Sequence, residues 1–418
     1  LAAASPAPSP PLLSHFSALV AATRKPVRQA ATPHRELYTS EAVFREEEAR
    51  VFESKWFCVG HASQVASPGD TFPSRVGRQP IFVTRTKKGE VRGFFNVCRH
   101  RGAKLVRKAG RYPVISCPYH RWGYSLEGKL VATPLWDSGP SAPKVDDKTK
   151  ALFEVEEGES FRKKDHGLFP VRVDQWGGLL FANLSGDAPP LRDYLGDLVP
   201  DHAEYPYEEL VVYRSALFDA RANWKLLMEN YLEYYHLPSV HPDLCNVSGV
   251  GEHQRNQGKG MYMGFKTEPL TDGGTAFDAA RLQPMPGISK EGATRAMHTG
   301  IFPNVFFSTY PHSVMCIRME PIGAEQTREH AELYVHPKAL SDPAMVEQLD
   351  SVWAFFMQVN QEDVDIVEDL ADGLHARPYT TGRYSFKFEE PLHRFGNMVA
   401  DALEGVERIP EGDEGRGG

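Results

Sequence analysis

The sequence predicts an α+β fold of two domains, a small all-β domain followed by a larger domain in which helices flank an antiparallel sheet. The chain has 418 residues, which is long for a single hydrophobic core. Between residues 57 and 130, short β-rich runs alternate with turns marked by Gly and Pro. In the second half, strand-like runs precede helix-like runs without the alternation that builds a parallel sheet.

The two ends of the chain differ from the rest in composition. Residues 1–35 contain no Asp or Glu and are rich in Ala, Ser and Pro. Residues 1–36 are therefore predicted to be a tail, either disordered or similar to an organelle transit peptide. Residues 406–418, which are charged and Gly-rich, are predicted to form a flexible tail.

Composition excludes several classes of protein. No apolar run approaches the roughly 18 residues that a membrane span requires, so no membrane association is expected. The formal net charge of -8 argues against general nucleic-acid binding. Five cysteines are too few, at this length, for a disulfide framework, which favours a reducing compartment.

The first folded domain is predicted over residues 37–170. It begins with a helix over residues 38–57, in which four apolar side chains are spaced to form one buried face: Phe44, Val51, Phe52 and Trp56. The runs "QPIFVTRT", "VRGFFNV" and "YPVISCPY" predict strands. Residues 139–165 are charged and lack periodicity, which predicts a surface excursion or linker.

The second folded domain is predicted over residues 171–405. Strands are expected in "FPVRVDQWGGLLFANL", "LVVYRSALFDARANW", "IFPNVFFSTY", "SVMCIRMEPI" and "HAELYVHP". One helix is expected in "WKLLMENYLEYYH", and a long one from Pro343 is closed by Gly373.

Two Cys–His pairs lie within the first domain. Cys98 and His100 form C-x-H, and Cys117 and His120 form C-x-x-H. Such a set serves either a structural zinc or a [2Fe–2S] cluster with cysteines on one iron and histidines on the other. Each pair supplies one cysteine and one histidine. This is the arrangement expected if each of two loops contributes a ligand to both irons. The mixed order therefore favours the cluster over zinc.

A second constellation lies in the second domain. Glu233, His236 and His241 form E-x-x-H-x4-H. Two histidines and a distant carboxylate make the facial triad of non-haem Fe(II) oxygenases. A five-residue spacing does not place two side chains on one face of a straight helix. Pro238 and Pro242 lead us to expect the helix to end near His236, with His241 on the following turn.

Together, the two motifs resemble those of the Rieske non-haem iron oxygenases. The likeness extends to the flanking stretches "NVCRHRGAKL", "CPYHRWGYSLEGKL" and "NWKLLMENYLEYYHLPSVHPDL", and covers roughly residues 38–405. It implies a Rieske [2Fe–2S] domain followed by a catalytic domain with mononuclear Fe(II). It also implies that a ferredoxin or ferredoxin-like reductase supplies electrons and that O2 is a substrate.

The resemblance also implies a third iron ligand on a late helix. In the family it is an aspartate, often within a Glu-Asp pair. The stretch "NQEDVDIVEDLADGL" matches and indicates Asp363, with Asp365 and Glu362 as competitors.

Two further residues gain roles from the resemblance. An acidic residue before the first iron histidine, here Glu233, connects a cluster histidine of one subunit with an iron histidine of the next. The implied assembly is a homotrimer. Asn230 lies close by and is expected to support the iron site.

The quaternary-ammonium subgroup of the family is the most similar, on the stretch from "LYTSEAVF" to "SPGDTF" and on both catalytic segments. A trimethylammonium group can rest on aromatic faces. The candidate pocket residues are Tyr231, Tyr234, Tyr235, Phe306, Phe307 and Tyr310.

With the transit-like tail, this resemblance implies choline hydroxylation to betaine aldehyde hydrate in the chloroplast stroma, or otherwise in the cytoplasm. The alternative is oxidative N-demethylation of glycine betaine, carnitine or another methylated amine. An aromatic-ring oxygenase and a Rieske electron carrier without oxygenation are further alternatives.

Overall fold

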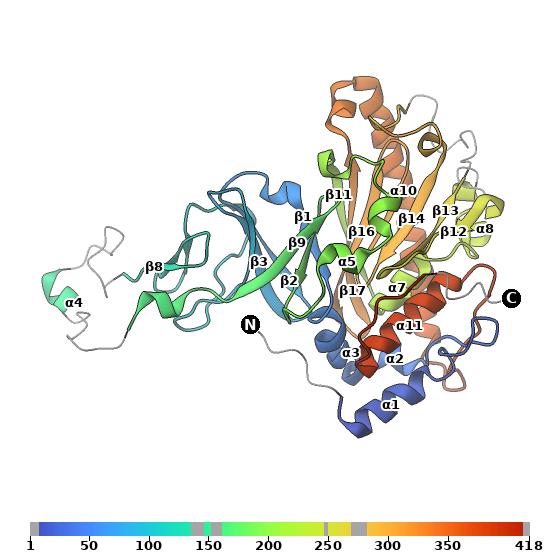
Figure 1. The fold of residues 1–418 in the computed structure, drawn as a ribbon, viewed down its shortest axis with the longest axis horizontal. Helices are drawn as coiled ribbons and strands as arrows, with labels where there is room; N and C mark the ends of the chain where they lie inside the picture. Colours follow the sequence, from blue (N-terminus) through green and yellow to red (C-terminus); the bar gives the residue numbers. More distant parts are fainter. Residues whose placement is uncertain (1–7, 135–145, 152–160, 246–249, 269–281, 413–418) are drawn as a thin grey trace. The chain divides into compact units, whose positions relative to one another are not determined.

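The computed structural model describes residues 8–134, 146–151, 161–245, 250–268 and 282–412 (Figure 1). The chain divides into two compact units. The first unit spans Val59–Gln175 and Leu179–Gly186, and the second spans Ala4–Cys58, Trp176–Gly178 and Asp187–Gly418. Both are built on antiparallel strands, and the helices belong almost entirely to the second, which confirms the α+β class.

The first unit contains two β-sheets. The larger has the order β1-β10-β9-β4-β3-β2-β5, and the smaller the order β6-β7-β8. The strands are β1 (Phe57–His61), β2 (Asp70–Val76), β3 (Gln79–Arg85), β4 (Val91–Phe95), β5 (Gly110–Arg111), β6 (Ile115–Ser116), β7 (Gly123–Tyr124), β8 (Leu130–Ala132), β9 (Pro170–Trp176) and β10 (Leu179–Asn183). A buried cluster that includes Phe82, Phe94, Val106 and Tyr124 forms its core.

The boundary that the sequence predicts between the two domains is wrong in two places. The helical segment after residue 36 packs in the second unit, because Phe44, Val51 and Phe52 bury their side chains there. Its elements are α2 (Glu36–Thr39), α3 (Glu41–Glu47) and η1 (Glu48–Phe52). Strand β9 extends the first unit's sheet through pairing of Val171 with Gly93 of β4, so the first unit continues beyond residue 170.

The second unit is built on a seven-stranded antiparallel sheet with the order β11-β17-β16-β15-β14-β13-β12. Its strands are β11 (Val211–Ala220), β12 (His253–Arg255), β13 (Tyr262–Thr267), β14 (Ala296–Ile301), β15 (Val305–Thr309), β16 (Val314–Gly323) and β17 (Gln326–Val335). Gly264 permits β13 and β14 to approach, because a Cβ there would overlap the carbonyl oxygen of His298.

The second unit contains the helices α7 (Trp224–Tyr231), α10 (Pro343–Gly373) and α11 (Glu390–Glu404). The side chain of Asn223 caps α7 by accepting from the backbone N–H of Lys225, and Asp342 caps α10 in the same way. The ammonium of Lys225 lies 2.5 Å from the carboxylate of Glu47, and both side chains are at most 1% exposed. This buried ion pair joins α7 to α3.

The described parts of both tails are structured, contrary to the prediction of a disordered and a flexible segment. Helix α1 (Pro10–Val20) packs on α11, with Phe16 fully buried and Ser17 donating to Glu404 at 2.7 Å. At the other end, the carbonyl of Pro410 accepts from the backbone N–H of Gly260, and Glu407 pairs with Lys55. Burial and ion pairing therefore order both segments.

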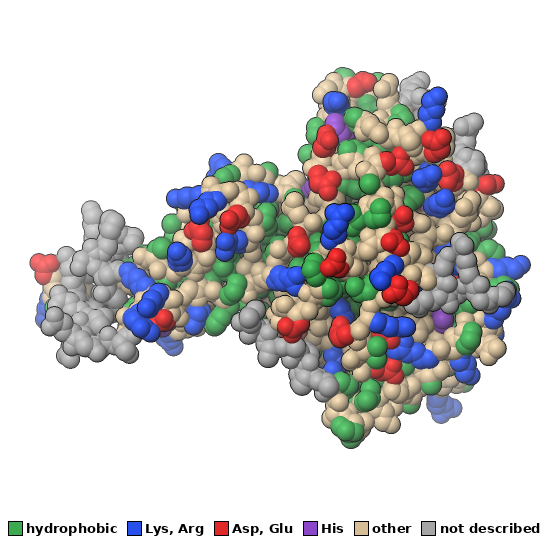
Figure 2. Space-filling view, in the orientation of Figure 1, with side chains coloured by type: hydrophobic (Ala, Val, Ile, Leu, Met, Phe, Trp, Pro, Cys, Tyr) green, Lys and Arg blue, Asp and Glu red, His purple; other side chains and the backbone are tan. Residues whose placement is uncertain are grey.

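The remaining helices are short. They are α4 (Asp147–Ala151), α5 (Leu191–Leu195), α6 (Leu198–Asp201), α8 (Leu237–Val240) and α9 (Pro242–Cys245), with brief 3-10 turns such as η3 (Lys163–His166) and η8 (Pro337–Ser341). Much of the predicted linker at residues 139–165 lies outside the described residues. No helix in the described part has the length and hydropathy of a membrane span. On the face of the second unit drawn in Figure 2, acidic and basic side chains are interspersed.

Candidate functional site

Two loops of the first unit bring the Cys–His pairs together. Cys98 follows β4 and Cys117 follows β6, and each loop is closed by hydrogen bonds from its own backbone. Both cysteines are at most 3% exposed, whereas His120 is exposed and His100 is half-buried. The two Nδ1 atoms of the histidines lie 3.1 Å apart. Two sulfurs therefore lie inside the unit and two imidazoles at its surface.

This donor set fits a [2Fe–2S] cluster. Paired sulfurs on the inner side and paired nitrogens on the outer side suit two irons with different ligands. The Tyr124 hydroxyl lies 3.3 Å from Cys98 Sγ, and the ring of Trp122 stacks on His100 at 4.8 Å. These contacts orient the ligands. Burial raises the pKa of the Cys117 thiol, so metal binding there must displace a proton.

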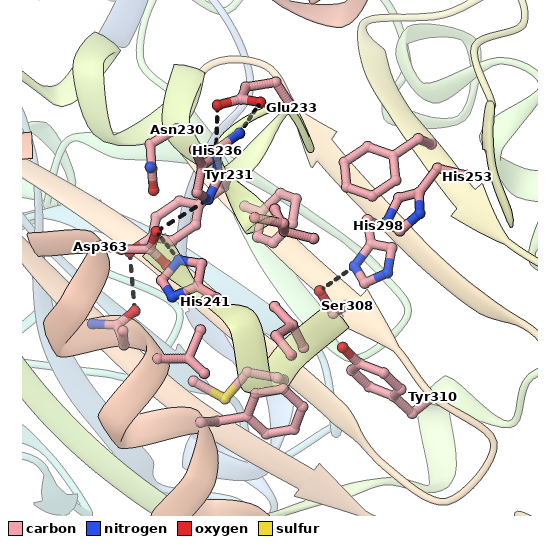
Figure 3. A pocket seen from close by; sticks show the side chains of 18 residues that line it. Asn230, Tyr231, Glu233, His236, His241, His253, His298, Ser308, Tyr310 and Asp363 are labelled. Atoms are coloured by element: carbon pink, nitrogen blue, oxygen red, sulfur yellow. Dashed lines mark hydrogen bonds and ion pairs between the residues drawn. The ribbon is translucent and has the colours of Figure 1, made fainter. Parts of the chain in front are cut away.

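The second constellation converges in the second unit (Figure 3). His236, His241 and Asp363 each offer an atom such that all three lie within 4.8 Å of one another. Asp363 Oδ1 lies 2.8 Å from His241 Nε2 and 3.5 Å from His236 Nε2. The arrangement fits a facial triad for a mononuclear iron.

A carboxylate lies beside the Nδ1 atom of each of the two imidazoles, on the side of the ring away from Asp363. His236 Nδ1 lies 2.5 Å from Glu233, and His241 Nδ1 lies 2.7 Å from Glu362. Each carboxylate accepts the Nδ1–H, which leaves Nε2 free to bind a metal. Burial disfavours the charged imidazole, but hydrogen bonds to Asp363 and Glu233 outweigh it and raise the pKa of His236 to about 9.

The three candidates for the third ligand occupy different surroundings. Asp363 is 5% exposed and faces both histidines, whose hydrogen bonds outweigh burial and lower its pKa. Glu362 reaches the other nitrogen of His241, and Asp365 is exposed and accepts from Gln361. Only Asp363 lies where the two Nε2 atoms meet.

The expectation that the first helix ends near His236 is wrong. Helix α7 ends at Tyr231, and His236 lies in the turn before α8, with His241 directly after that helix. The Glu233 carboxylate accepts from the backbone N–H groups of Tyr235 and His236, in place of the carbonyls that a continuing helix would offer. This residue therefore stabilises the turn that follows the helix and orients the first histidine.

A cavity of about 80 Å³ opens beside this group (Figure 3). Of the six predicted pocket residues, Tyr231, Phe306 and Tyr310 line it. Asn230 and Glu233 line it as well, and the buried side-chain oxygen of Asn230 has no hydrogen-bond partner among the described residues.

The other three predicted pocket residues lie elsewhere. Tyr234 does not line the cavity but packs against Phe265, which does, and Tyr235 is 60% exposed. Phe307 follows Phe306 on β15 and therefore points to the opposite face of the sheet, where it contacts Trp176.

Four cavity residues that the sequence analysis missed form a row across the sheet. Phe265, His298, Ser308 and Met315 pair in register on β13, β14, β15 and β16. The period of two along β15 could have indicated Ser308, which is two residues from Phe306. The register between strands is not evident from the residues.

The cavity carries little positive charge. No Lys or Arg is among its described lining residues. Burial lowers the pKa of His298 to about 3, so this imidazole is neutral at physiological pH, and its Nδ1 lies 2.8 Å from Ser308 Oγ. Apart from the two triad histidines, whose pKa values are raised, and His253, the polar groups that face a bound molecule are therefore neutral or acidic.

Two family models match the chain in succession. The Rieske [2Fe-2S] domain matches residues 55–146, and the ring hydroxylating alpha subunit (catalytic domain) matches residues 202–405. The first contains both Cys–His pairs, and the second contains the group of His236, His241 and Asp363.

Several curated proteins are similar over most of their length. A carnitine monooxygenase oxygenase subunit of Acinetobacter pittii (strain PHEA-2) is 29% identical, over 82% of this chain and 85% of that protein. A glycine betaine monooxygenase oxygenase subunit of Chromohalobacter salexigens is 27% identical, over 91% and 88%. A chloroplastic choline monooxygenase of Atriplex hortensis is 25% identical, over 94% and 82%.

A solved structure has the same fold. The quaternary ammonium Rieske monooxygenase CntA, in complex with an inhibitor, superposes with a TM-score of 0.76 at 24% identity, over 91% of this chain and 98% of that one. The two domain matches, the two metal-binding constellations and this fold agree. The chain belongs to the Rieske non-haem iron oxygenases and is an alpha subunit with a [2Fe–2S] cluster and a mononuclear iron.

Proposed function

We propose that the chain hydroxylates a small quaternary ammonium compound, and that this compound is choline, converted to betaine aldehyde hydrate. The observation that carries the choice is a cavity with aromatic walls and no Lys or Arg among its described lining residues. The similarity to oxygenases named for carnitine, glycine betaine and choline supports the substrate class.

In this proposal, the chain's residues have separate tasks. Cys98, His100, Cys117 and His120 hold the cluster, and His236, His241 and Asp363 hold the iron. When bound, the two centres supply single electrons and the activation of O2. Glu233 orients His236, and Asn230 offers its unpartnered oxygen to the cavity.

The aromatic walls suit a trimethylammonium head. Tyr231 stacks on Phe306 with ring centroids 5.2 Å apart, and Tyr310 lies 5.3 Å from Phe356. A desolvated cation over such faces gains about 2 kcal/mol. In this proposal, the rings would hold an N-methyl or adjacent CH2 group within the cavity that the metal-binding group also lines.

The other end of the substrate distinguishes the candidates. Glycine betaine and carnitine carry a carboxylate, which is costly to bury without a cation. His298 is neutral, and no Lys or Arg among the described lining residues replaces it. The hydroxyl of choline needs only a neutral partner, such as His298 or Ser308.

Reconstitution tests the proposal. The purified protein, with iron and cluster, would be given ferredoxin, its reductase and choline, glycine betaine or carnitine in turn. We expect O2 uptake with choline, betaine aldehyde as product and no formaldehyde. Asp363→Ala should lose the iron and the turnover but keep the visible spectrum of the cluster. Retained iron and turnover in that variant would show that another residue is the third ligand.

N-demethylation is the second candidate, because the relatives named for carnitine and glycine betaine share 29% and 27% identity with this chain, against 25% for the relative named for choline. Hydroxylation of an N-methyl group gives a carbinolamine that releases formaldehyde. Formaldehyde formed with glycine betaine or carnitine, in the absence of choline oxidation, would establish this reaction in place of the first.

We further propose that the working enzyme is a homotrimer in which Glu233 connects a cluster with the iron of the next subunit. A mixing experiment tests this. His120→Ala should remove the cluster, and Asp363→Ala should remove the iron, so each homo-oligomer is inactive. If subunits exchange and electrons cross between them, the mixture regains turnover. No recovery, with exchange verified by mass, would refute the crossing.

The plastid location stays a prediction from composition. A fluorescent fusion to the complete reading frame, imaged in plant cells, tests it. Retention in the cytoplasm would favour the alternative location.

A further inference from the structure

Three buried polar side chains form a closed ring of contacts beside the metal-binding group. The Tyr231 hydroxyl lies 2.9 Å from Glu329 Oε1 and 2.9 Å from Asn360 Oδ1, and Asn360 Nδ2 lies 3.1 Å from Glu329 Oε2. Glu329 is fully buried on β17, and Asn360 is 2% exposed on α10, one turn before Asp363. Tyr231 and Asn360 also line the cavity, so the ring borders the site where oxygen is activated.

Counting protons fixes the charge of this ring. Three contacts need three protons, one for each hydrogen bond. The tyrosine hydroxyl provides one, and the amide group of Asn360 provides one in either orientation. An ionised Glu329 provides none, which would leave two acceptor atoms facing each other without a proton. A neutral Glu329 donates to the Tyr231 oxygen, Tyr231 donates to Asn360, and Asn360 donates to Glu329.

The surroundings of Glu329 agree with this count. Burial raises its pKa to about 7, with the hydrogen bonds from Asn360 and Tyr231 opposing the rise and the charge of Asp363 adding to it. Its register partners on the neighbouring strands, Phe218 of β11 and Met319 of β16, carry no charge. The titratable groups that face it are therefore Tyr231 and Asp363.

The proposed reaction consumes protons. Hydroxylation converts a C–H bond and O2 into C–OH and water, and it requires two electrons and two protons. The one-electron donor protein supplies the electrons through the cluster. The protons have to enter a cavity whose walls are largely apolar.

We propose that Glu329 is a reserve for one of the two protons of the oxygen reaction, the other coming from cavity water, and delivers its proton through the hydroxyl of Tyr231. The Tyr231 hydroxyl, which donates to Asn360 at rest, turns to a water in the cavity, releases its proton to that water and takes the proton of Glu329. At Tyr231 one O–H bond breaks and another forms, while Glu329 loses its O–H bond and the water gains one. Glu329 regains a proton from cavity water by the reverse path between turnovers. The inference rests on the proposed oxygenase function, and Glu329 acts through Tyr231 as a positioning residue.

Infrared spectroscopy of the metal-free protein tests the resting state without turnover. Burial also raises the pKa of Glu229, to about 8, so this residue contributes the same carbonyl band to the wild type and to Glu329→Gln and cancels in their difference spectrum. The wild-type minus Glu329→Gln difference should contain the carbonyl band of a protonated carboxylic acid at pH 6, and this difference band should fade as pH rises through about 7. Absence of the difference band at pH 6 would overturn the assignment whatever the enzyme's substrate is.

Turnover tests the delivery. Glu329→Gln can keep all three hydrogen bonds, because its amide can donate to Tyr231 and accept from Asn360, but it has no acidic proton. We expect kcat to fall about 100-fold with KM unchanged, at the lower end of what a positioned proton donor contributes. The wild-type kcat should decline as pH rises through about 7, and the variant should lose that dependence.

The control is Glu332→Gln, on the same strand but accepting from Tyr334 instead of from the ring. It should retain wild-type kcat and pH dependence. If Glu329→Gln matches this control, the proton reserve is refuted while the oxygenase function stands. If no methylated amine is oxidised by the wild type, the proposed function fails, and the infrared result still decides the charge of Glu329.

Discussion

Replacing Glu362 by Gln should weaken iron binding without touching an iron ligand. Glu362 lies 2.7 Å from Nδ1 of His241, whose own side chain is 1% exposed, while the carboxylate is 34% exposed. A Gln oxygen can still accept this N–H, so the loss is the difference between a charge-assisted and a neutral hydrogen bond. That difference is about 1.5 kcal/mol, or about tenfold in iron affinity.

Titration with a competing Fe(II) chelator under anaerobic conditions measures the effect. The visible spectrum of the cluster counts intact protein, because the first metal site is in a separate unit. Asp365→Asn is the matched control: it removes the same charge from the same helix, but its side chain is exposed and contacts Gln361. We expect the control to stay within about twofold of wild type. Equal iron release from both variants would refute the role assigned to Glu362.

Three more predictions concern stability. Lys225→Met should lower the free energy of unfolding by about 3–5 kcal/mol, because it leaves the buried carboxylate of Glu47 without its cation. Arg328→Met removes an exposed ion pair and should lower it by less than about 1 kcal/mol. Denaturant unfolding of both variants measures the two changes. Burial lowers the pKa of His202 to about 3. Below about pH 6.5 the unfolded chain binds a proton at this residue and the folded protein does not, so the free energy of unfolding falls with decreasing pH. The loss is about 2 kcal/mol between pH 8 and pH 5, and His202→Phe should remove that part of the slope in unfolding curves recorded at both values. Gly264→Ala should force β14 away from β13 at His298 and lower the melting temperature by several degrees. An unchanged melting temperature would show that the two strands can separate there without loss of stability.

Most of the residues proposed to bind the metals could be proposed from the sequence because they lie within short intervals of the chain. Cys98 to His120 and Glu233 to His241 need only residue types and intervals. The distant Asp363 came from resemblance alone, since its neighbours Glu362 and Asp365 are also carboxylates. What separates the three is the direction in which each side chain leaves α10, and this depends on how that helix packs.

The residues that line the cavity and the boundaries of the two units could not be predicted from local sequence patterns. Phe306 and Phe307 are the same type of residue. Which of them lines the cavity depends on which face of β15 is turned towards it. The N-terminal segment has the composition of a tail, yet Phe16 has a partner surface on a helix near the other end of the chain. Contacts between residues so far apart leave no local pattern.

The second unit is discontinuous, and this has a consequence for synthesis. Ser17 hydrogen-bonds Glu404, 387 residues later, and a ribosome working at about 5–20 residues per second needs about 20–80 seconds to cover that interval. The first unit is complete at Gly186 and can fold during this time. Helix α1 cannot pack until α11 has been synthesised. Until then the apolar face of α1 stays exposed on the nascent chain, N-terminal to a unit that has already folded. Early release or shortening of the C-terminal helix should therefore produce a chain with one competent metal unit and a second that aggregates.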